Sequence, residues 1–181
     1  MQYQFNINLT ENDYMAYNHF HALETAYGRK QVLKSRIVMI CLMAFLAAVY
    51  VFVLGWDGFT ATCVTAMALF TVIYMIFFKK ILKRNITKQI KKLKATGKLP
   101  FESTSTLEFY DDKLVEISAK ARSEQSYDTL ERICVMKDQY IFLYQSSITA
   151  ILLPVPQLRA KADLNEFLNF LSAKCSKIEH Y

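Results

Sequence analysis

Two consecutive apolar runs joined by a short turn constrain this chain more than any other feature. The first run extends from Ile37 to Gly55 and the second from Phe59 to Phe78, with Trp56-Asp57-Gly58 between them. As helices of nineteen and twenty residues, each would be roughly 30 Å long, which matches the hydrocarbon core of a bilayer. Asp57 is the one formally charged residue of the whole stretch. We therefore predict a transmembrane helical hairpin at residues 37–78.

Basic residues flank both outer ends of this predicted hairpin, whereas its turn carries none. Arg29, Lys30, Lys34 and Arg36 precede the first run, and the segment 79–98 follows the second with nine basic and no acidic residues. Positively charged flanks are retained on the cytoplasmic side of a membrane. We therefore predict a multi-pass plasma-membrane protein with both termini in the cytoplasm.

The segment 79–98 has the spacing of a basic juxtamembrane helix, because Leu82, Ile86, Ile90 and Leu93 recur every three or four residues. Excess positive charge beside a membrane span favours a bilayer with anionic headgroups as the partner, and we expect no nucleic acid. Two interpretations remain open, an ordinary topology signal with a solvated face and a specific lipid or partner site. The cations predicted to contact the membrane surface are Lys79, Lys80, Lys83, Arg84, Lys88, Lys91 and Lys92.

Small residues within the two runs are candidates for the packing of one helix on the other, because they allow close approach in lipid. No Asp, Glu, Lys, Arg or His lies inside either run, whereas proton relays and ion pathways usually require such groups. An anchor is therefore favoured over a conduit. The alternative is a subunit of an oligomeric channel or transport assembly with Thr60, Thr62, Thr65 and Thr71 lining a pore. The predicted packing residues are Ala44, Ala48, Ala61, Thr65 and Ala68.

The N-terminal segment predicts one strand followed by one helix. Apolar and polar residues alternate strictly over residues 3–9, which is typical of a half-buried strand that needs a distant partner. Thr10 and Asp13 have the spacing of a capping box, so a helix should follow. We predict an amphipathic helical segment at 10–36 that leads to the membrane. Its aromatic stripe either packs on the soluble domain or lies at the membrane interface.

The C-terminal segment predicts a small sheet-rich domain. Short runs with a period of two indicate strands near residues 106–110, 115–119, 123–127, 133–136, 140–144 and 148–153. Asp163 can cap a final helix whose apolar face includes Phe167 and Leu171. We therefore predict an α+β soluble domain, an antiparallel β-barrel or sheet capped by a C-terminal helix.

The residue types that commonly carry catalysis or bind metals are scattered along the chain. His19 and His21 are two positions apart, which on a helix turns their side chains about 200° from one another. Lys120 and Arg122 either lie in a lipid-phosphate loop or are ordinary solvated charges. We predict no catalytic, cofactor-binding or metal-binding site, no cofactor and no enzymatic activity. The four cysteines have neither CxxC nor metal-ligand spacing and are Cys41, Cys63, Cys134 and Cys175.

The order of these elements resembles the YcxB-like family of small bacterial membrane proteins, whose soluble part is similar to a pleckstrin-homology (PH) domain. The resemblance implies that residues 1–9 return to join the C-terminal strands, so that one PH-like domain, 1–9 plus 99–181, is split around the hairpin. It implies a bacterial plasma membrane and brings no catalytic residues. Pro154-Val155-Pro156 departs from the family pattern, in which a basic residue follows the proline. The segments that carry the resemblance are residues 3–9, Thr10-Glu11-Asn12-Asp13-Tyr14, the hairpin, Ser126-Tyr127, 140–144 and Leu152-Leu153-Pro154.

The expected function is therefore non-catalytic. The hairpin would anchor a PH-like cytoplasmic module that binds an unidentified protein partner or a lipid headgroup. Assembly of several copies stays open. Besides the channel subunit, the remaining alternative is a membrane immunity-type inhibitor that neutralises a toxin.

Overall fold

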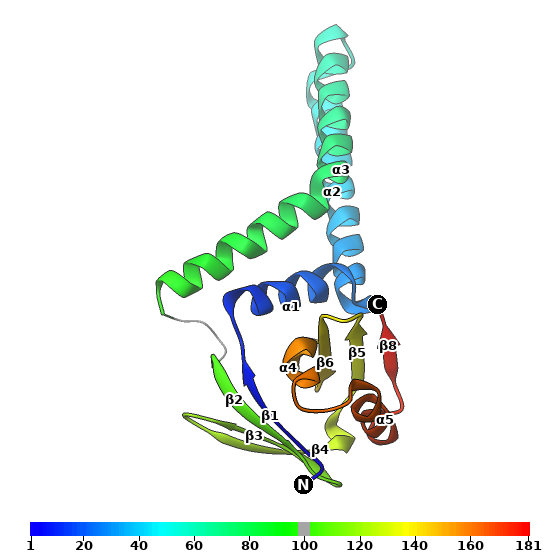
Figure 1. Ribbon diagram of the computed structural model, residues 1–181. Coiled ribbons are helices and arrows are strands. Elements are labelled where there is room, and N and C mark those ends of the chain that lie inside the picture. The colour runs from blue at the N-terminus through cyan, green and yellow to red at the C-terminus, as the bar shows by residue number, and fades with distance from the viewer. Residues whose placement is uncertain (98–101) are drawn as a thin grey trace. The chain divides into compact units, whose positions relative to one another are not determined.

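The computed structural model describes residues 1–97 and 102–181 and is shown in Figure 1. Two compact units make up the chain, one of residues 1–17 with 90–181 and the other of residues 18–89. The helices are α1 (Glu11–Leu23), α2 (Ala26–Leu54), α3 (Gly58–Ala95), α4 (Val155–Arg159) and α5 (Leu164–Lys174), with a 3-10 turn at Tyr127–Thr129. The strands are β1 (Tyr3–Asn8), β2 (Thr104–Phe109), β3 (Lys113–Ser118), β4 (Arg122–Ser126), β5 (Arg132–Met136), β6 (Tyr140–Tyr144), β7 (Ala150–Pro154) and β8 (Ile178–His180).

Helices α2 and α3 are long and apolar enough to cross a membrane. A core helix of a soluble protein would bury its apolar stretch, but none of the most apolar window of α2 and 6% of that of α3 is buried. Each helix is longer than its predicted apolar run. Helix α2 begins at Ala26, and α3 continues as far as Ala95. Lys98, the predicted end of the basic helix, and residues 99–101, the predicted start of the second part of the soluble domain, lie outside the described residues.

The predicted helical segment 10–36 is divided between α1 and α2. Thr25 has extended backbone angles and caps α2, because its hydroxyl accepts a hydrogen bond from Gly28 N at 3.0 Å. The same hydroxyl donates to His21 O at 2.7 Å. A Cβ on Gly28 would lie 2.1 Å from His21 O, so only glycine fits this close approach. The aromatic stripe therefore divides, with Phe20 buried in α1 and Tyr27 39% exposed in α2.

The first sheet is antiparallel and has the strand order β1-β2-β3-β4. Strand β1 pairs with β2 over its whole length, with Phe5 opposite Leu107, although the two strands are about a hundred residues apart in the chain. The long-range partner that the alternation in residues 3–9 requires is thus β2. Burial follows the pleat, because Phe5 and Ile7 are buried and the intervening Asn6 is exposed.

The second sheet has the order β7-β6-β5-β8. Strands β5, β6 and β7 pair antiparallel, with the fully apolar centre of β6 between its neighbours. Strand β8 pairs in parallel with β5, and Cys134 lies opposite Glu179. The strands thus form two open sheets, so of the predicted barrel or sheet the barrel is not confirmed.

One apolar core joins the two sheets with α4 and α5. Phe167 of α5 is fully buried, and its ring centroid lies 5.0 Å from those of Phe5 and Phe109, in edge-on contacts. Asp163 caps α5 as predicted, because its carboxylate accepts hydrogen bonds from the Asn165 and Glu166 amides. The sheet-rich C-terminal part with its terminal helix is therefore as expected. The short helix α4, which begins directly after Pro154, was not predicted.

Candidate functional site

The basic half of α3 carries a continuous cationic surface. All seven cations predicted to contact the membrane surface are exposed. The apolar line predicted along the same helix turns away from solvent, since Leu82 and Ile86 are half-buried and Ile90 is 3% exposed. Helix α3 contains no acidic residue that could neutralise its cations. This surface is therefore strongly electropositive and suited to anionic groups.

The C-terminal part of α1 packs on α3 at the start of this surface. His19 Nε2 lies 3.3 Å from both Lys83 O and Thr87 Oγ1. Leu23 shares a small buried cluster with Phe78 and Val32. These contacts occupy one side of α3. His19 is thus part of a helix contact.

A groove of about 440 Å³ lies along α3, where the apolar run meets the basic segment. Its lining residues recur every three or four positions, so they lie on one face of the helix. The groove is apolar and aromatic at one end and cationic at the other. The residues that line it are Phe70, Ile73, Tyr74, Phe77, Lys80, Ile81 and Arg84. Two of the predicted membrane-surface cations, Lys80 and Arg84, thus line this groove.

Residues other than the predicted small ones connect α2 and α3. Tyr50 lies 3.7 Å from Cys63 through its hydroxyl, and Arg36 donates to Met75 O at 3.3 Å. The Arg36 guanidinium also lies 5.6 Å from the Phe78 ring centroid. The structure leaves Ala44, Ala48, Thr65 and Ala68 exposed and half-buries Ala61, so four of the five predicted packing residues lie away from the helix contact. The half-buried residues beside them are Met43, Ala47, Tyr50, Cys63, Val64 and Met67.

The threonines of the pore alternative bond to their own helix. Thr62, Thr65 and Thr71 each donate to the carbonyl four residues earlier, at 2.8 Å. Thr60 is fully buried next to the turn, and its amide donates to Asp57 Oδ1 at 2.7 Å. Thr62 and Thr65 are exposed, whereas Thr71 is half-buried. These four residues therefore do not present one shared polar face.

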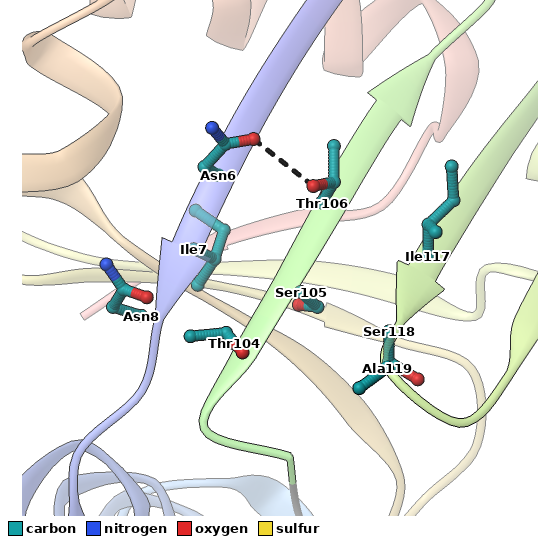
Figure 2. Close-up of a pocket in the computed structure, with 9 residues that line it drawn as sticks. All are labelled: Asn6, Ile7, Asn8, Thr104, Ser105, Thr106, Ile117, Ser118 and Ala119. Atoms are coloured by element: carbon teal, nitrogen blue, oxygen red, sulfur yellow. Dashed lines mark hydrogen bonds between the residues drawn. The ribbon is translucent and has the colours of Figure 1, made fainter.

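A second, neutral hollow of about 480 Å³ lies at one end of β1, β2 and β3 of the first sheet and is shown in Figure 2. Thr106 Oγ1 lies 3.2 Å from Asn6 Oδ1 across β1 and β2. Ile117 of β3 lies next in the same cross-strand row. Amides and hydroxyls dominate this lining, and it includes no ionisable side chain. It can hydrogen-bond a polar group but offers no acid–base pair.

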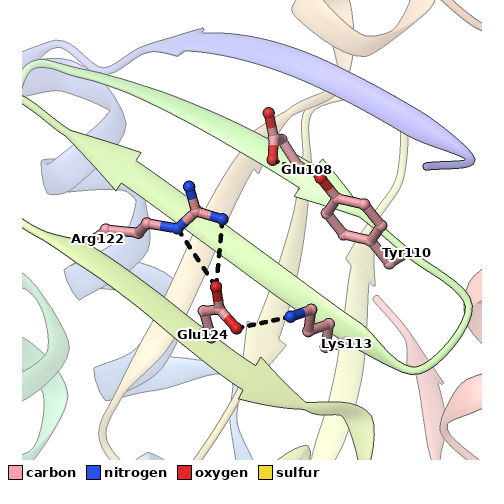
Figure 3. Close-up of polar contacts among 5 residues, drawn as sticks. All are labelled: Glu108, Tyr110, Lys113, Arg122 and Glu124. Atoms are coloured by element: carbon pink, nitrogen blue, oxygen red, sulfur yellow. Dashed lines mark hydrogen bonds and ion pairs between the residues drawn. The ribbon is translucent and has the colours of Figure 1, made fainter.

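Two ion pairs lie on β3 and β4, on the face of the first sheet that points away from the core, as Figure 3 shows. Glu124 contacts Lys113 at 2.7 Å and Arg122 at 3.2 Å. The hydrogen bond from Lys113, followed by its charge, lowers the pKa of Glu124 below its usual value. Lys120, the other predicted loop cation, lies 3.8 Å from Glu102 and is 85% exposed. Both loop cations are thus partly neutralised, and such exposed pairs contribute little to stability.

Glu116 lies on the opposite face of the same sheet. It pairs with Leu107, which is 1% exposed, so its side chain points toward the core side. Burial raises the pKa of Glu116, a hydrogen bond from Ser105 opposes the shift, and the charge of Glu102 adds to it. The sequence pattern gave no sign of this residue, because an alternating strand normally directs its acidic residues to solvent.

A group of ionisable residues lies where β8 meets β5. Cys134 is fully buried, and its Sγ lies 3.6 Å from Glu179. Burial raises the pKa of this thiol to about 11, so it is unreactive. Tyr181 donates to Glu179 at 2.8 Å, and the Arg132 guanidinium stacks 4.3 Å from the Tyr144 ring centroid. All four cysteines are free, and the described part of the chain has no group of three His, Cys, Asp or Glu residues that could hold a metal.

A further hollow of about 630 Å³ lies between the start of α1, the turn before β6 and the end of β7 with the start of α4. Its acidic residues already form hydrogen bonds or an ion pair within the protein. Asp13 accepts hydrogen bonds from Thr10 and Tyr140, and Asp138 pairs with Arg159. It therefore offers few free groups to a ligand.

Two long apolar helices and an α+β part with two four-stranded sheets define a candidate membrane protein with a small folded module. Residues 109–171, from the end of β2 into α5, match the model of the YcxB-like protein family. This match confirms the resemblance to that family over these residues. Comparison with curated proteins and with solved structures found no match.

Proposed function

We propose that this protein is a non-enzymatic, multi-pass protein of a bacterial plasma membrane. In this proposal α2 and α3 anchor a PH-like module to the cytoplasmic leaflet, with both termini in the cytoplasm. The module binds a protein partner or a lipid headgroup. The observation that carries the proposal is the continuity of α3, which passes from an exposed apolar surface into an exposed cationic one without a break.

Exposed apolar side chains support the anchoring role. Phe52 is 90% exposed, and Phe45 and Ile76 are 64% and 69% exposed. Contiguous apolar surface of this kind is unfavourable in water and favourable in lipid. The cations that follow would then lie at headgroup level, where each Lys or Arg gains about 1 kcal/mol near an anionic surface.

The PH-like part of the proposal rests on topology and on the shared core. Antiparallel strands form the first sheet and most of the second, and the C-terminal helix α5 fills the space between them through Phe167. The polar side chains on the face of the first sheet away from the core pair with one another, as in Thr106 with Asn6 and Lys113 with Glu124. This arrangement supports a binding surface more than a reaction centre.

The topology can be tested in the full chain with single cysteines. The four native cysteines would be replaced by serine, and Trp56→Cys or Ser147→Cys introduced. Trp56 lies in the turn between α2 and α3, and Ser147 in the turn between β6 and β7, and both are exposed. A membrane-impermeant maleimide should label Trp56→Cys in intact spheroplasts and Ser147→Cys only after lysis.

The opposite labelling pattern would reject the proposed orientation. Release of the chain from membranes by alkaline carbonate would reject the anchor itself. The channel alternative predicts ion flux through purified protein in liposomes, lost when the four threonines are replaced by leucine. The contacts of Thr62, Thr65 and Thr71 with their own helix favour the anchor.

A further inference from the structure

We propose that the groove on α3 binds one anionic phospholipid, with an acyl chain along Phe70, Ile73 and Phe77 and the phosphate between Lys80 and Arg84. This inference rests on the proposed function, because it requires that α3 lie in a bilayer. It adds a defined binding site to a surface that would otherwise attract lipids only through its overall charge.

The apolar end of the groove matches an acyl chain. Phe70, Ile73 and Phe77 are 52%, 55% and 47% exposed, so their side chains are left without protein contacts over about half of their surface. Helix geometry separates Phe70 from Phe77 by about 10 Å. This length lies within one leaflet, whose hydrocarbon layer is about 15 Å thick. The groove therefore fits one acyl chain of a single lipid.

The cationic end matches a phosphate. Lys80 and Arg84 are one helical turn apart and both line the groove. Among the residues that the structure describes, neither forms an ion pair, and α3 itself has no acidic residue. An Arg guanidinium can bind phosphate oxygens through two parallel hydrogen bonds, and a neighbouring ammonium adds a point charge. Two free cations therefore converge where one anion can sit.

The order of the two ends favours a lipid over a protein helix. The apolar part belongs to the run that ends at Phe78, and Lys80 and Arg84 follow directly. If the run crosses a bilayer, the apolar end of the groove lies among acyl chains and its cationic end lies at the headgroups. A phospholipid has its apolar and charged parts in the same order. An amphipathic partner helix would need an acidic residue at the depth of Lys80 and Arg84. Charge and depth together therefore specify an anionic phospholipid.

The test is native mass spectrometry of the full-length protein in detergent, titrated with phosphatidylglycerol and, separately, with phosphatidylcholine. Wild-type protein should retain one phosphatidylglycerol in preference to phosphatidylcholine. The double variant Lys80→Gln/Arg84→Gln should bind it about tenfold more weakly or worse, because two charge-assisted contacts are lost. Phe77→Ala should weaken binding of the same lipid with both cations intact.

The matched control is Lys79→Gln/Lys83→Gln, which removes the same charge from the same turns. Lys79 and Lys83 do not line the groove, and Lys79 points about 180° from Phe70. This control should bind phosphatidylglycerol within about twofold of wild type. Inorganic phosphate at millimolar concentration should not displace the lipid, since it cannot occupy the apolar end.

Three results would overturn the site. Equal losses in the two double variants would mean that only overall charge attracts the lipid. Displacement by inorganic phosphate would mean that the acyl chain contributes nothing. A dimer that disappears in Phe77→Ala would mean that a second copy occupies the groove. In each case carbonate-resistant membrane attachment would remain, so the proposed function would stand. Loss of that attachment would instead reject both.

Discussion

The Tyr140 hydroxyl donates a hydrogen bond of 2.7 Å to Asp13 Oδ1. Asp13 Oδ2 accepts from Thr10 N at 2.7 Å, which is the reciprocal contact of a capping box. One carboxylate therefore caps the first turn of α1 and fastens it to β6. The local capping signal and the long-range contact stabilise the same conformation of the N-terminal segment.

Removing only the hydroxyl separates these two roles. Tyr140→Phe should lower the free energy of unfolding by about 1–2 kcal/mol, because Asp13 loses a charged hydrogen bond while its cap survives. Burial, with the Asp13 hydrogen bond second, raises the pKa of Tyr140, so the phenol stays protonated as the donor. The measurement is denaturant unfolding of the full chain in detergent, followed by alkylation of the buried Cys134 thiol.

Tyr110→Phe is the matched control for this experiment. Its hydroxyl donates to Glu108 at 2.9 Å, only two residues away along the chain, so this hydrogen bond does not connect a helix to the sheet. The control should therefore lose less stability than Tyr140→Phe. Equal losses would show that the Tyr140 contact does not fasten α1 to the sheet.

Glu116 and Glu124 should give the stability opposite dependences on pH. Burial raises the pKa of Glu116 above its usual value near 4.5, so its ionisation costs more in the folded than in the unfolded protein. Stability from this residue is fully present below about pH 4.5 and is lost as pH rises through the folded pKa. Glu116→Gln should therefore be more stable than wild type at pH 7, and the gain should vanish in acid.

Glu124 has the reverse sign, because Lys113 lowers its pKa in the folded state. Its stabilising contribution is present above about pH 4.5 and is lost as pH falls through the folded pKa. Glu124→Gln should be slightly less stable than wild type at pH 7 and equal to it in acid. Parallel unfolding curves at about pH 2 and at pH 7 measure both variants, and a shared sign would contradict the assignment of Glu116 to the core side.

Local signals predicted the elements that local contacts stabilise. The capping residues Thr10 and Asp163, the alternation in β1 and the apolar hairpin could all be read from short windows. Strand β8 could not, because three residues carry no period and its parallel pairing with β5 is set by the fold. The break at Thr25 was hidden because the apolar stripe continues across it.

The candidate site was predicted in part. Lys80 and Arg84 stood out as cations beside a span, but Phe70 and Ile73 were assigned only to the span itself. Their common face follows from the helical period, so the groove was implicit in the spacing. The seam between α2 and α3 was different, because small residues occur on every face of these helices and only packing selects Ala47 over Ala48.

The junction between α1 and α2 should tolerate no side chain at Gly28. In Gly28→Ala the new Cβ would meet backbone atoms of His21 and Ala22 at 2.1 and 2.6 Å. Relief requires a backbone shift, so we expect a loss of about 2 kcal/mol or more. Thermal unfolding in detergent, followed by far-ultraviolet circular dichroism, measures it.

Gly58→Ala provides the control within the same unit. Gly58 begins α3, and a Cβ added there would have no atom within 4 Å beyond its chain neighbours and its own helix backbone. Alanine favours helix, so stability should be unchanged or rise by up to about 1 kcal/mol. Similar melting temperatures for the two variants would show that Gly28 is not a close approach.

Gln157 hydrogen-bonds to the backbone of β1 at the edge of the first sheet. Its side-chain amide accepts from Asn8 N at 2.8 Å and donates to Asn8 O at 2.7 Å, as a neighbouring strand would. Gln157→Ala should raise the hydrogen-exchange rate of the Asn8 amide about fivefold, the equivalent of roughly 1 kcal/mol. Gln157→Glu keeps the acceptor and loses the donor, so it should protect that amide better than alanine does. Gln4→Ala, which removes an exposed contact to Glu108, should leave Asn8 unchanged. If both Gln157 variants exchange at the wild-type rate, the edge of β1 is protected by its pairing with β2 alone.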